Sequence, residues 1–147
     1  MTRILSLDDD LEWLDMLKAL LEHRGYESLV AGNEQKALSI LRTESIDLFT
    51  QDVVHPGMGG WDFLLLIKSD AALKHIPVII ISAASMSSQA EQVKPLGLNL
   101  ERDLACYLEK PICVEHLIQG IEGACAVSYC SRSIRSEPTG TRIEWTS

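Results

Sequence analysis

The sequence predicts a single α/β domain built on a parallel β-sheet with helices on both faces. Short apolar runs alternate five times with longer amphipathic segments along the chain. One of these runs, VIIIS at 78–82, is β-branched and apolar on both faces, which is typical of strands buried in parallel sheets. Five units of this size favour a doubly wound, five-stranded, flavodoxin-like sheet with strand order 2-1-3-4-5.

The individual elements can be placed from their patterns. Strands are expected at RILSL (3–7), YESLVA (26–31), IDLFTQ (46–51), VIIIS (78–82) and ACYLE (105–109). Helices are expected where apolar residues recur every three or four positions, at 11–25, 34–44, 61–70 and 112–125. Gly25 suits the C′ position of the first helix, and Asn33 suits the N-cap of the second.

Two segments depart from this regular pattern. Residues 85–103 are expected to hold a helix that is interrupted near Pro95-Leu96-Gly97. From residue 127 onward the composition turns to serine, arginine, threonine and glycine without periodicity. We therefore predict a folded domain over residues 1–126 and a flexible C-terminal tail over residues 127–147.

Length, composition and charge limit the classes of function. A chain of 147 residues with 46% hydrophobic residues fits one domain with one core, and its net charge of −8 argues against direct binding to nucleic acid. No apolar run is long enough to span a bilayer, and the opening MTRILSLDDD meets acidic residues too early for a secretory signal. We expect a cytoplasmic protein with no membrane partner.

Polar residues gather at one edge of the predicted sheet. Asp8, Asp9 and Asp10 follow the first strand and Asp52 follows the third, while Ser82 ends the fourth and Lys110 follows the fifth. In a parallel sheet these carboxyl ends lie at the same edge, where ligands bind. Carboxylates on adjacent strands, about 5 Å apart, would repel by about 3 kcal/mol. A hard cation such as Mg²⁺ would relieve this repulsion, and the lysine and serine could hold phosphoryl oxygens.

These residues also carry a resemblance to a known family. The chain resembles the receiver domain of bacterial response regulators, the chemotaxis-regulator-like domains of two-component signal transduction, over about residues 3–123. Four motifs carry the resemblance in the expected order: ILSLDDD, DLFTQDVVHPGMGGWDF, PVIIISA and YLEKP. Thr50 and Gln51 depart from the family pattern, because they are polar where apolar strand residues are usual.

The resemblance implies a role for each site residue. Asp52 would be the phosphoacceptor that becomes an aspartyl phosphate, with Lys110 and Ser82 contacting the phosphoryl group. Asp9 would bind Mg²⁺ directly and Asp8 through water. These implied metal ligands are completed by Asp52 and the main-chain carbonyl of Val54. Tyr107 would be the aromatic switch residue that turns inward on phosphorylation.

The function implied is that of a phosphoprotein in two-component signalling or a phosphorelay, and not a true enzyme. A histidine kinase or phosphotransfer protein would donate the phosphoryl group. The face formed by the fourth helix, fifth strand and fifth helix would then bind a downstream effector protein. The resemblance leaves open whether the chain also forms a homodimer. This hypothesis requires the carboxyl group of Asp52 to be accessible and directed toward positions 9 and 110.

Two other functions fit parts of the sequence. LSLDDDLEW resembles the D-x-D opening of haloacid-dehalogenase-like phosphatases, with Asp8 as nucleophile and Asp10 as acid/base. That hypothesis leaves Asp52 unexplained and lacks a later acidic pair. A pseudo-receiver, a binding module that keeps the fold without phosphorylation, is the other alternative. The acidic triplet taken alone would be helix capping, and we expect that role for Asp10 in either case.

Overall fold

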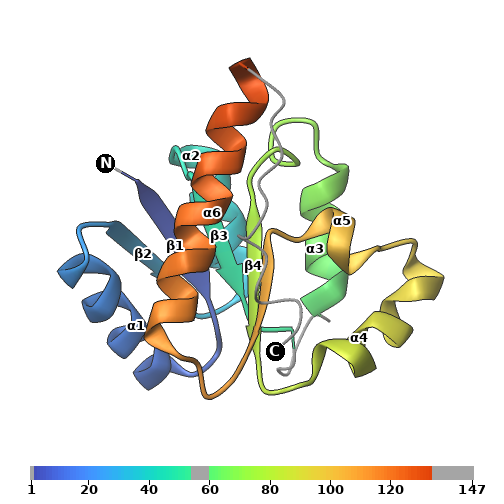
Figure 1. Ribbon diagram of the computed structural model, residues 1–147, viewed down its shortest axis with the longest axis horizontal. Helices are drawn as coiled ribbons and strands as arrows, with labels where there is room; N and C mark the ends of the chain where they lie inside the picture. The colour runs from blue at the N-terminus through green and yellow to red at the C-terminus, as the bar shows by residue number, and fades with distance from the viewer. Residues whose placement is uncertain (1, 54–59, 134–147) are drawn as a thin grey trace.

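The predicted parallel sheet is present. The computed structural model describes residues 2–53 and 60–133, and it contains one five-stranded parallel sheet with the order β2-β1-β3-β4-β5 (Figure 1). The strands are β1 (Arg3–Leu7), β2 (Glu27–Ala31), β3 (Leu48–Gln51), β4 (Val78–Ser82) and β5 (Cys106–Glu109). The strand order agrees with the prediction, and it places β1 and β3 side by side at the centre.

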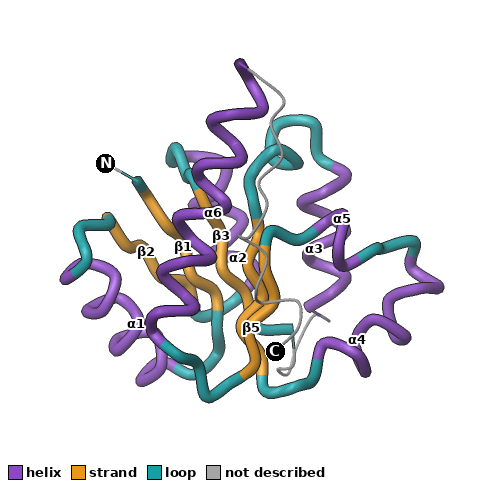
Figure 2. The backbone as a smooth tube through the Cα atoms, viewed as in Figure 1, coloured by secondary structure: helices purple, strands orange, loops and turns teal. Residues whose placement is uncertain are grey.

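Helices cover both faces of this sheet. The helices are α1 (Leu11–His23), α2 (Glu34–Thr43), α3 (Gly60–Ser69), α4 (Met86–Val93), α5 (Leu100–Asp103) and α6 (Val114–Ser133). Helices α1 and α6 lie on one face of the sheet, and α2, α3 and the α4–α5 segment lie on the other (Figure 2). Apolar side chains of each group of helices pack against the sheet on their own side. Within the described residues, no helix has both the length and the apolar character needed to cross a membrane.

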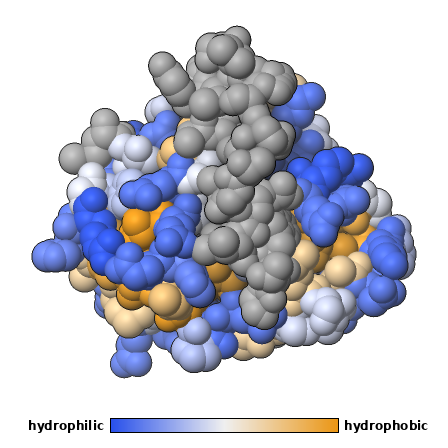
Figure 3. Space-filling model, viewed as in Figure 1, coloured by the Kyte–Doolittle hydropathy of each residue, from blue (hydrophilic) through white to orange (hydrophobic). Residues whose placement is uncertain are grey.

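The polar sides of the helices face outward. On the side of the molecule seen in Figure 3, hydrophilic residues surround smaller hydrophobic areas.

The central part of the sheet is buried on both faces. All five residues of β4 are buried, which explains why this strand is apolar on both faces. The hydrophobic residues therefore divide between two cores, one on each side of the sheet.

The ends of the first two helices follow the capping residues that the sequence predicts. The Asp10 side chain accepts a hydrogen bond from Trp13 N, and Asn33 caps α2 in the same way through Lys36 N. Gly25 has φ +92° and follows the last turn of α1, where Tyr26 N donates to Leu21 O at 3.0 Å. This left-handed residue and its hydrogen bond form a Schellman C-cap, which returns the chain toward β2.

The segment before β5 contains two short helices joined by a turn. Helix α4 runs into a 3₁₀ turn at Lys94–Leu96, and Gly97 then adopts φ +84°. This interruption lies where the sequence predicts it. The four-residue helix α5 follows as a separate element.

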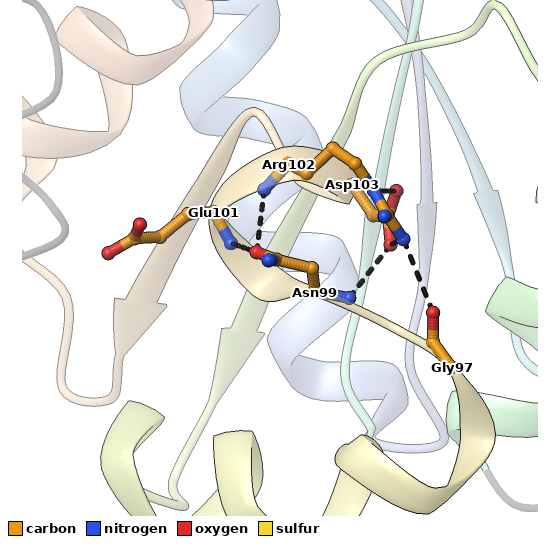
Figure 4. A network of polar contacts seen from close by, with 5 residues as sticks. All are labelled: Gly97, Asn99, Glu101, Arg102 and Asp103. Atoms are coloured by element: carbon orange, nitrogen blue, oxygen red, sulfur yellow. Dashed lines mark hydrogen bonds and ion pairs between the residues drawn. The ribbon is translucent and has the colours of Figure 1, made fainter.

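A polar network holds the short helix α5 in place (Figure 4). Asn99 Oδ1 accepts hydrogen bonds from Glu101 N and Arg102 N, while Asp103 Oδ2 accepts one from Asn99 N at 2.9 Å. Arg102 in turn pairs with Asp103 and donates to Gly97 O. Reciprocal capping of this kind satisfies the amides that a helix of one turn leaves unpaired.

The last helix continues past the predicted domain boundary. Helix α6 ends at Ser133, whereas the tail is predicted to begin at residue 127. Residues 134–147 lie outside the described residues, so the flexible tail stays a prediction. The part of α6 before residue 126 packs on the sheet through Leu117 and Ile121, both fully buried.

The first prediction concerns Gly60, the first residue of α3. A Cβ atom on Gly60 would lie 2.8 Å from Val53 Cβ and 2.9 Å from Val53 O, closer than real contacts allow. We expect Gly60→Ala to lower the free energy of unfolding by about 1–3 kcal/mol, because the backbone must shift to admit the methyl group. Urea unfolding followed by far-ultraviolet circular dichroism measures this change.

Gly32→Ala is the matched control. A Cβ atom at position 32 would meet only Leu11 Cδ2, at 3.2 Å, and that atom ends an exposed side chain that can move aside. We expect this variant to unfold within about 0.5 kcal/mol of the unmodified protein. Equal losses in the two variants would contradict a tight approach at Gly60.

Candidate functional site

The ends of β1 and β3 place two carboxylates next to each other. Leu7 and Gln51 are paired in the register of these strands, and Asp8 and Asp52 are the residues that follow them. Backbone hydrogen bonds extend the pairing to both acids, since Asp8 N donates to Ala31 O and Asp52 N donates to Leu7 O, each at 3.2 Å. The sheet itself therefore fixes the backbone beneath both carboxylates.

Lys110 joins the two carboxylates. Its Nζ atom lies 2.9 Å from Asp8 Oδ2 and 3.1 Å from Asp52 Oδ2. The lysine is positioned by the end of β5, because Lys110 N donates to Ser82 O at 2.8 Å. Three strand ends that are distant in sequence thus meet at one ammonium group.

The carboxylates hold Lys110 in its charged form. Burial by itself would lower the pKa of Lys110. The hydrogen bond to Asp8 and the negative charges of Asp8 and Asp52 outweigh that effect, so the pKa of Lys110 is raised above its ordinary value. A charged lysine at this position offsets part of the repulsion between the two acids.

Asp52 points toward Lys110, as the sequence hypothesis requires, but it is less accessible than that hypothesis requires. Only 8% of the Asp52 side chain is exposed, and only 3% of the Asp8 side chain. The contact of both acids with Lys110 accounts for part of this burial. A reactant approaching Asp52 therefore needs neighbouring groups to move aside.

The three acids that follow β1 have different surroundings. Asp8 is buried, and its Oδ1 atom accepts a hydrogen bond from Asp10 N at 3.0 Å. Asp10 is the N-cap of α1, as expected, and Asp9 is exposed to solvent. Because the Asp10 carboxylate binds Trp13 N, this acid acts as a helix cap, and the acid/base role of the phosphatase hypothesis gains no support.

Ser82 ends β4, Tyr107 lies in the neighbouring strand β5, and both side chains bind the backbone of Ala84. Ser82 is fully buried, and its Oγ accepts a hydrogen bond from Ala84 N at 3.1 Å. Tyr107 is 1% exposed, and its hydroxyl donates to Ala84 O at 2.7 Å. In this structure the tyrosine side chain is turned inward, and both residues hold the same turn after β4.

Burial also changes the acidity of Tyr107. Desolvation is the largest effect on the pKa of Tyr107 and raises it. A hydrogen bond with Ser82 opposes this increase, and the negative charges of Glu109 and Asp52 add smaller increases, so the pKa is raised to about 12. The phenol therefore stays protonated at neutral pH, so it can donate its hydrogen bond to Ala84 O.

Two further polar contacts connect β3, α3 and α4, and neither was predicted from the sequence. Gln51 Nε2 donates to Gly60 O at 2.7 Å, and Trp61 Nε1 donates to Gln89 Oε1 at 2.6 Å. The first contact connects β3 with α3, and the second connects α3 with α4. The polar residue Gln51 in an apolar strand was the available signal for the first contact, whereas nothing in the sequence pairs Trp61 with Gln89.

The residues present fit a magnesium site of the kind that keeps several waters. Within the described part of the chain, no three or more His, Cys, Asp or Glu side chains are grouped as metal ligands. However, Mg²⁺ in proteins is held by one or two carboxylates together with water and phosphate oxygens. Lys110 Nζ contacts both Asp8 and Asp52, so these two carboxylates lie close enough together to bind one cation. The predicted ligand Val54 lies outside the described residues.

Comparisons with known proteins place this geometry in a family. The family model for the response regulator receiver domain matches residues 4–122. The polar-differentiation response regulator DivK of Brucella anthropi is 29% identical over 119 residues, which cover 81% of this chain and 92% of DivK. DivK of Brucella ovis is 29% identical over 123 residues, covering 83% of this chain and 95% of that protein.

Solved structures agree with this family match. A response regulator receiver domain from Clostridium thermocellum is 28% identical with a TM-score of 0.76, and the match covers 89% of this chain and 99% of that one. A CheY-like receiver domain protein from Methanospirillum hungatei, 23% identical with a TM-score of 0.77, shares the fold over 89% of this chain and 98% of its own.

These findings decide between the hypotheses at the level of the family. The family model covers most of the chain, including the acids that follow β1 and β3 and all strand residues of the described sheet except Arg3. This match gives no support to the hypothesis of a haloacid-dehalogenase-like phosphatase. The chain belongs to the response regulator receiver domain family of two-component signalling, and it is a signalling domain, not a classical enzyme.

Proposed function

We propose that this chain is a phosphoacceptor that takes a phosphoryl group onto Asp52 from a histidine kinase or a phosphotransfer protein. The observation that carries the proposal is the contact of Lys110 Nζ with both Asp8 and Asp52, at 2.9 and 3.1 Å. A lysine in this position lies beside the oxygen that would bond to phosphorus. The family match supports the same assignment.

The proposed reaction is a direct transfer between two side chains. One carboxylate oxygen of Asp52 attacks the phosphorus atom of a phosphohistidine on the donor protein, and a new P–O bond forms. The P–N bond breaks, and the imidazole nitrogen keeps its electron pair and takes up a proton. The product is an acyl phosphate on Asp52, which water later hydrolyses to restore the carboxylate.

The neighbouring residues would stabilise charge during this transfer. Lys110 would exchange its contact with Asp52 Oδ2 for one with a phosphoryl oxygen, and the Ser82 hydroxyl would donate to another. A magnesium ion bound by Asp8, Asp9, Asp52 and the main-chain carbonyl of Val54 would supply positive charge close to the phosphoryl oxygens. Because Asp52 is only 8% exposed, this role also requires the site to open for the donor.

The signal would leave the site through the turn after β4. Ser82 and Tyr107 both bind Ala84, so a Ser82 hydroxyl that turns toward a phosphoryl oxygen would change the hydrogen bonds of that turn. Met86 N, at the start of α4, donates to Glu109 Oε2 at the end of β5. A shift of this turn would alter the face formed by α4, β5 and α6, where an effector protein would bind.

The second prediction tests the acceptor. After incubation with acetyl phosphate and Mg²⁺, we expect the protein to gain the mass of one phosphoryl group, and we expect Asp52→Asn to gain none, because an amide oxygen cannot form the acyl phosphate. Intact-protein mass spectrometry measures the adduct. The pseudo-receiver alternative predicts no adduct on either protein.

Asp62→Asn is the matched control for this experiment. It makes the same change of charge on an exposed side chain in the first turn of α3. We expect it to be phosphorylated like the unmodified protein. An adduct that persists in Asp52→Asn would show that another residue is the acceptor.

The third prediction concerns pH and Tyr107. Its pKa is raised to about 12, so in alkaline solution the unfolded chain loses this proton before the folded protein does. The folded state then binds more protons than the unfolded state, and the free energy of unfolding falls as pH rises from about 10 to about 12. The raised pKa of Lys110 acts in the same direction.

The variant Tyr107→Phe separates these contributions. It removes the ionising hydroxyl and leaves Lys110 unchanged, so we expect a shallower loss of stability with rising pH than in the unmodified protein. Urea unfolding at about pH 9 and about pH 11.5 gives the comparison. Parallel losses in the two proteins would mean that the hydroxyl of Tyr107 is not buried in solution.

A further inference from the structure

The indole ring of Trp13 lies against the site lysine. Lys110 Nζ is 4.7 Å from the centroid of the Trp13 ring, well inside the range of a cation–π contact. Trp13 belongs to α1, whereas Lys110 follows β5, so the contact joins two elements that are distant in sequence. The ring lies beside an ammonium group that also contacts the two carboxylates.

A closed series of interactions connects the backbone and the ring of Trp13 with the site. Asp8 Oδ1 accepts from Asp10 N at 3.0 Å, and Asp10 Oδ1 accepts from Trp13 N at 3.1 Å. The Trp13 ring contacts Lys110, and Lys110 Nζ donates a hydrogen bond to Asp8 Oδ2 at 2.9 Å, which closes the series at Asp8. Each member of this circuit limits the movement of the next, so Trp13 is held by the same acidic turn that forms part of the site.

The ring also changes the surroundings of the ammonium group. The Lys110 side chain is 22% exposed, and Trp13 is half-buried, packing against the core that the sheet forms with α1 and α6. Water is displaced from the side of the ammonium group that the ring covers, which strengthens its attraction to the nearby carboxylates. A lysine has many rotamers, and this ring removes some of them.

We propose that Trp13 is a positioning residue that holds the Lys110 ammonium beside Asp52, ready to meet a phosphoryl oxygen. This inference rests on the proposed phosphoacceptor function and adds a residue to it. Trp13 does not touch the reacting atoms. It acts by keeping the charge of Lys110 where negative charge would develop, so less reorganisation is needed during transfer.

Two variants of Trp13 test this role. Trp13→Leu keeps an apolar side chain and removes the π face, whereas Trp13→Phe keeps an aromatic ring. We expect Trp13→Leu to slow phosphorylation by acetyl phosphate and Mg²⁺ about threefold to tenfold, and Trp13→Phe to restore much of the rate. Leu20→Ala is the control, because Leu20 is another half-buried residue of α1 that packs on the same core. We expect its rate to be unchanged.

A second measurement reads the contact without any phosphorylation. In protein labelled with ¹³C-lysine, the ring current of Trp13 should shift the Cε–Hε signals of Lys110, which are assigned by their loss in Lys110→Met. We expect these signals to move toward ordinary lysine positions in Trp13→Leu and to stay shifted in Leu20→Ala. The two readouts together separate positioning of Lys110 from general packing of α1.

The outcomes distinguish this inference from the proposed function. A Trp13→Leu protein with an unmoved Lys110 signal, or with the rate of the unmodified protein, would overturn the positioning role while leaving Asp52 as acceptor. Rates lowered equally by Trp13→Leu and Leu20→Ala would also overturn it. Absence of any adduct on the unmodified protein would remove the proposed function and, with it, the role of Trp13 in transfer, even if the Lys110 signal moved.

Discussion

The charge balance among Asp8, Asp52 and Lys110 is the interaction on which the site depends. Two buried carboxylates share one ammonium group, at 2.9 and 3.1 Å. Removing one partner from a buried, hydrogen-bonded set of charges leaves the others uncompensated, which is costly in a site with little access to water. The same arrangement suits a phosphoacceptor, because two neighbouring carboxylates can bind a hard cation and the lysine is already near the oxygen that would receive phosphorus.

This balance exists only because of the sheet topology. Lys110 is 102 positions from Asp8 and 58 from Asp52 along the chain. The order β2-β1-β3-β4-β5 makes β1 and β3 neighbours and puts the ends of all parallel strands at one edge. Rigid strands beneath the acids hold them close, and the turn after β4 connects the site with α4 and β5. The inward position of Tyr107 belongs to the same arrangement, since its hydroxyl binds Ala84 O in that turn.

Much of the fold could be predicted from the sequence, because its signals are local and repeated. Alternating apolar runs located the five strands, and capping residues such as Asp10, Gly25 and Asn33 located helix ends. The end of α6 at Ser133 could not be predicted, since the residues beyond 126 carry no apolar period. The separate helix α5 also escaped prediction, because one turn is too short to show a period.

The candidate site also has parts that could be predicted from the sequence and parts that could not. Asp8, Asp52, Ser82 and Lys110 could be placed at one edge because each follows or ends a strand. The contacts of Trp13 with Lys110 and of Trp61 with Gln89 could not be foreseen, because each joins residues from different helices or loops whose relative rotation only the packed structure sets. The low exposure of Asp52 is also a tertiary effect, because it depends on how closely the neighbouring groups pack, which the sequence pattern does not give.

In the proposed function the carboxylate of Asp52, and not that of Asp8 or Asp9, bonds to phosphorus. Borohydride reduction tests this assignment directly, because hydride converts an acyl phosphate into an alcohol, releases phosphate and leaves homoserine where the aspartyl phosphate stood. The protein is treated with acetyl phosphate and Mg²⁺, reduced, digested and sequenced by tandem mass spectrometry. The account predicts homoserine in place of Asp52. Homoserine at position 8 or 9, with Asp52 unchanged, would contradict it.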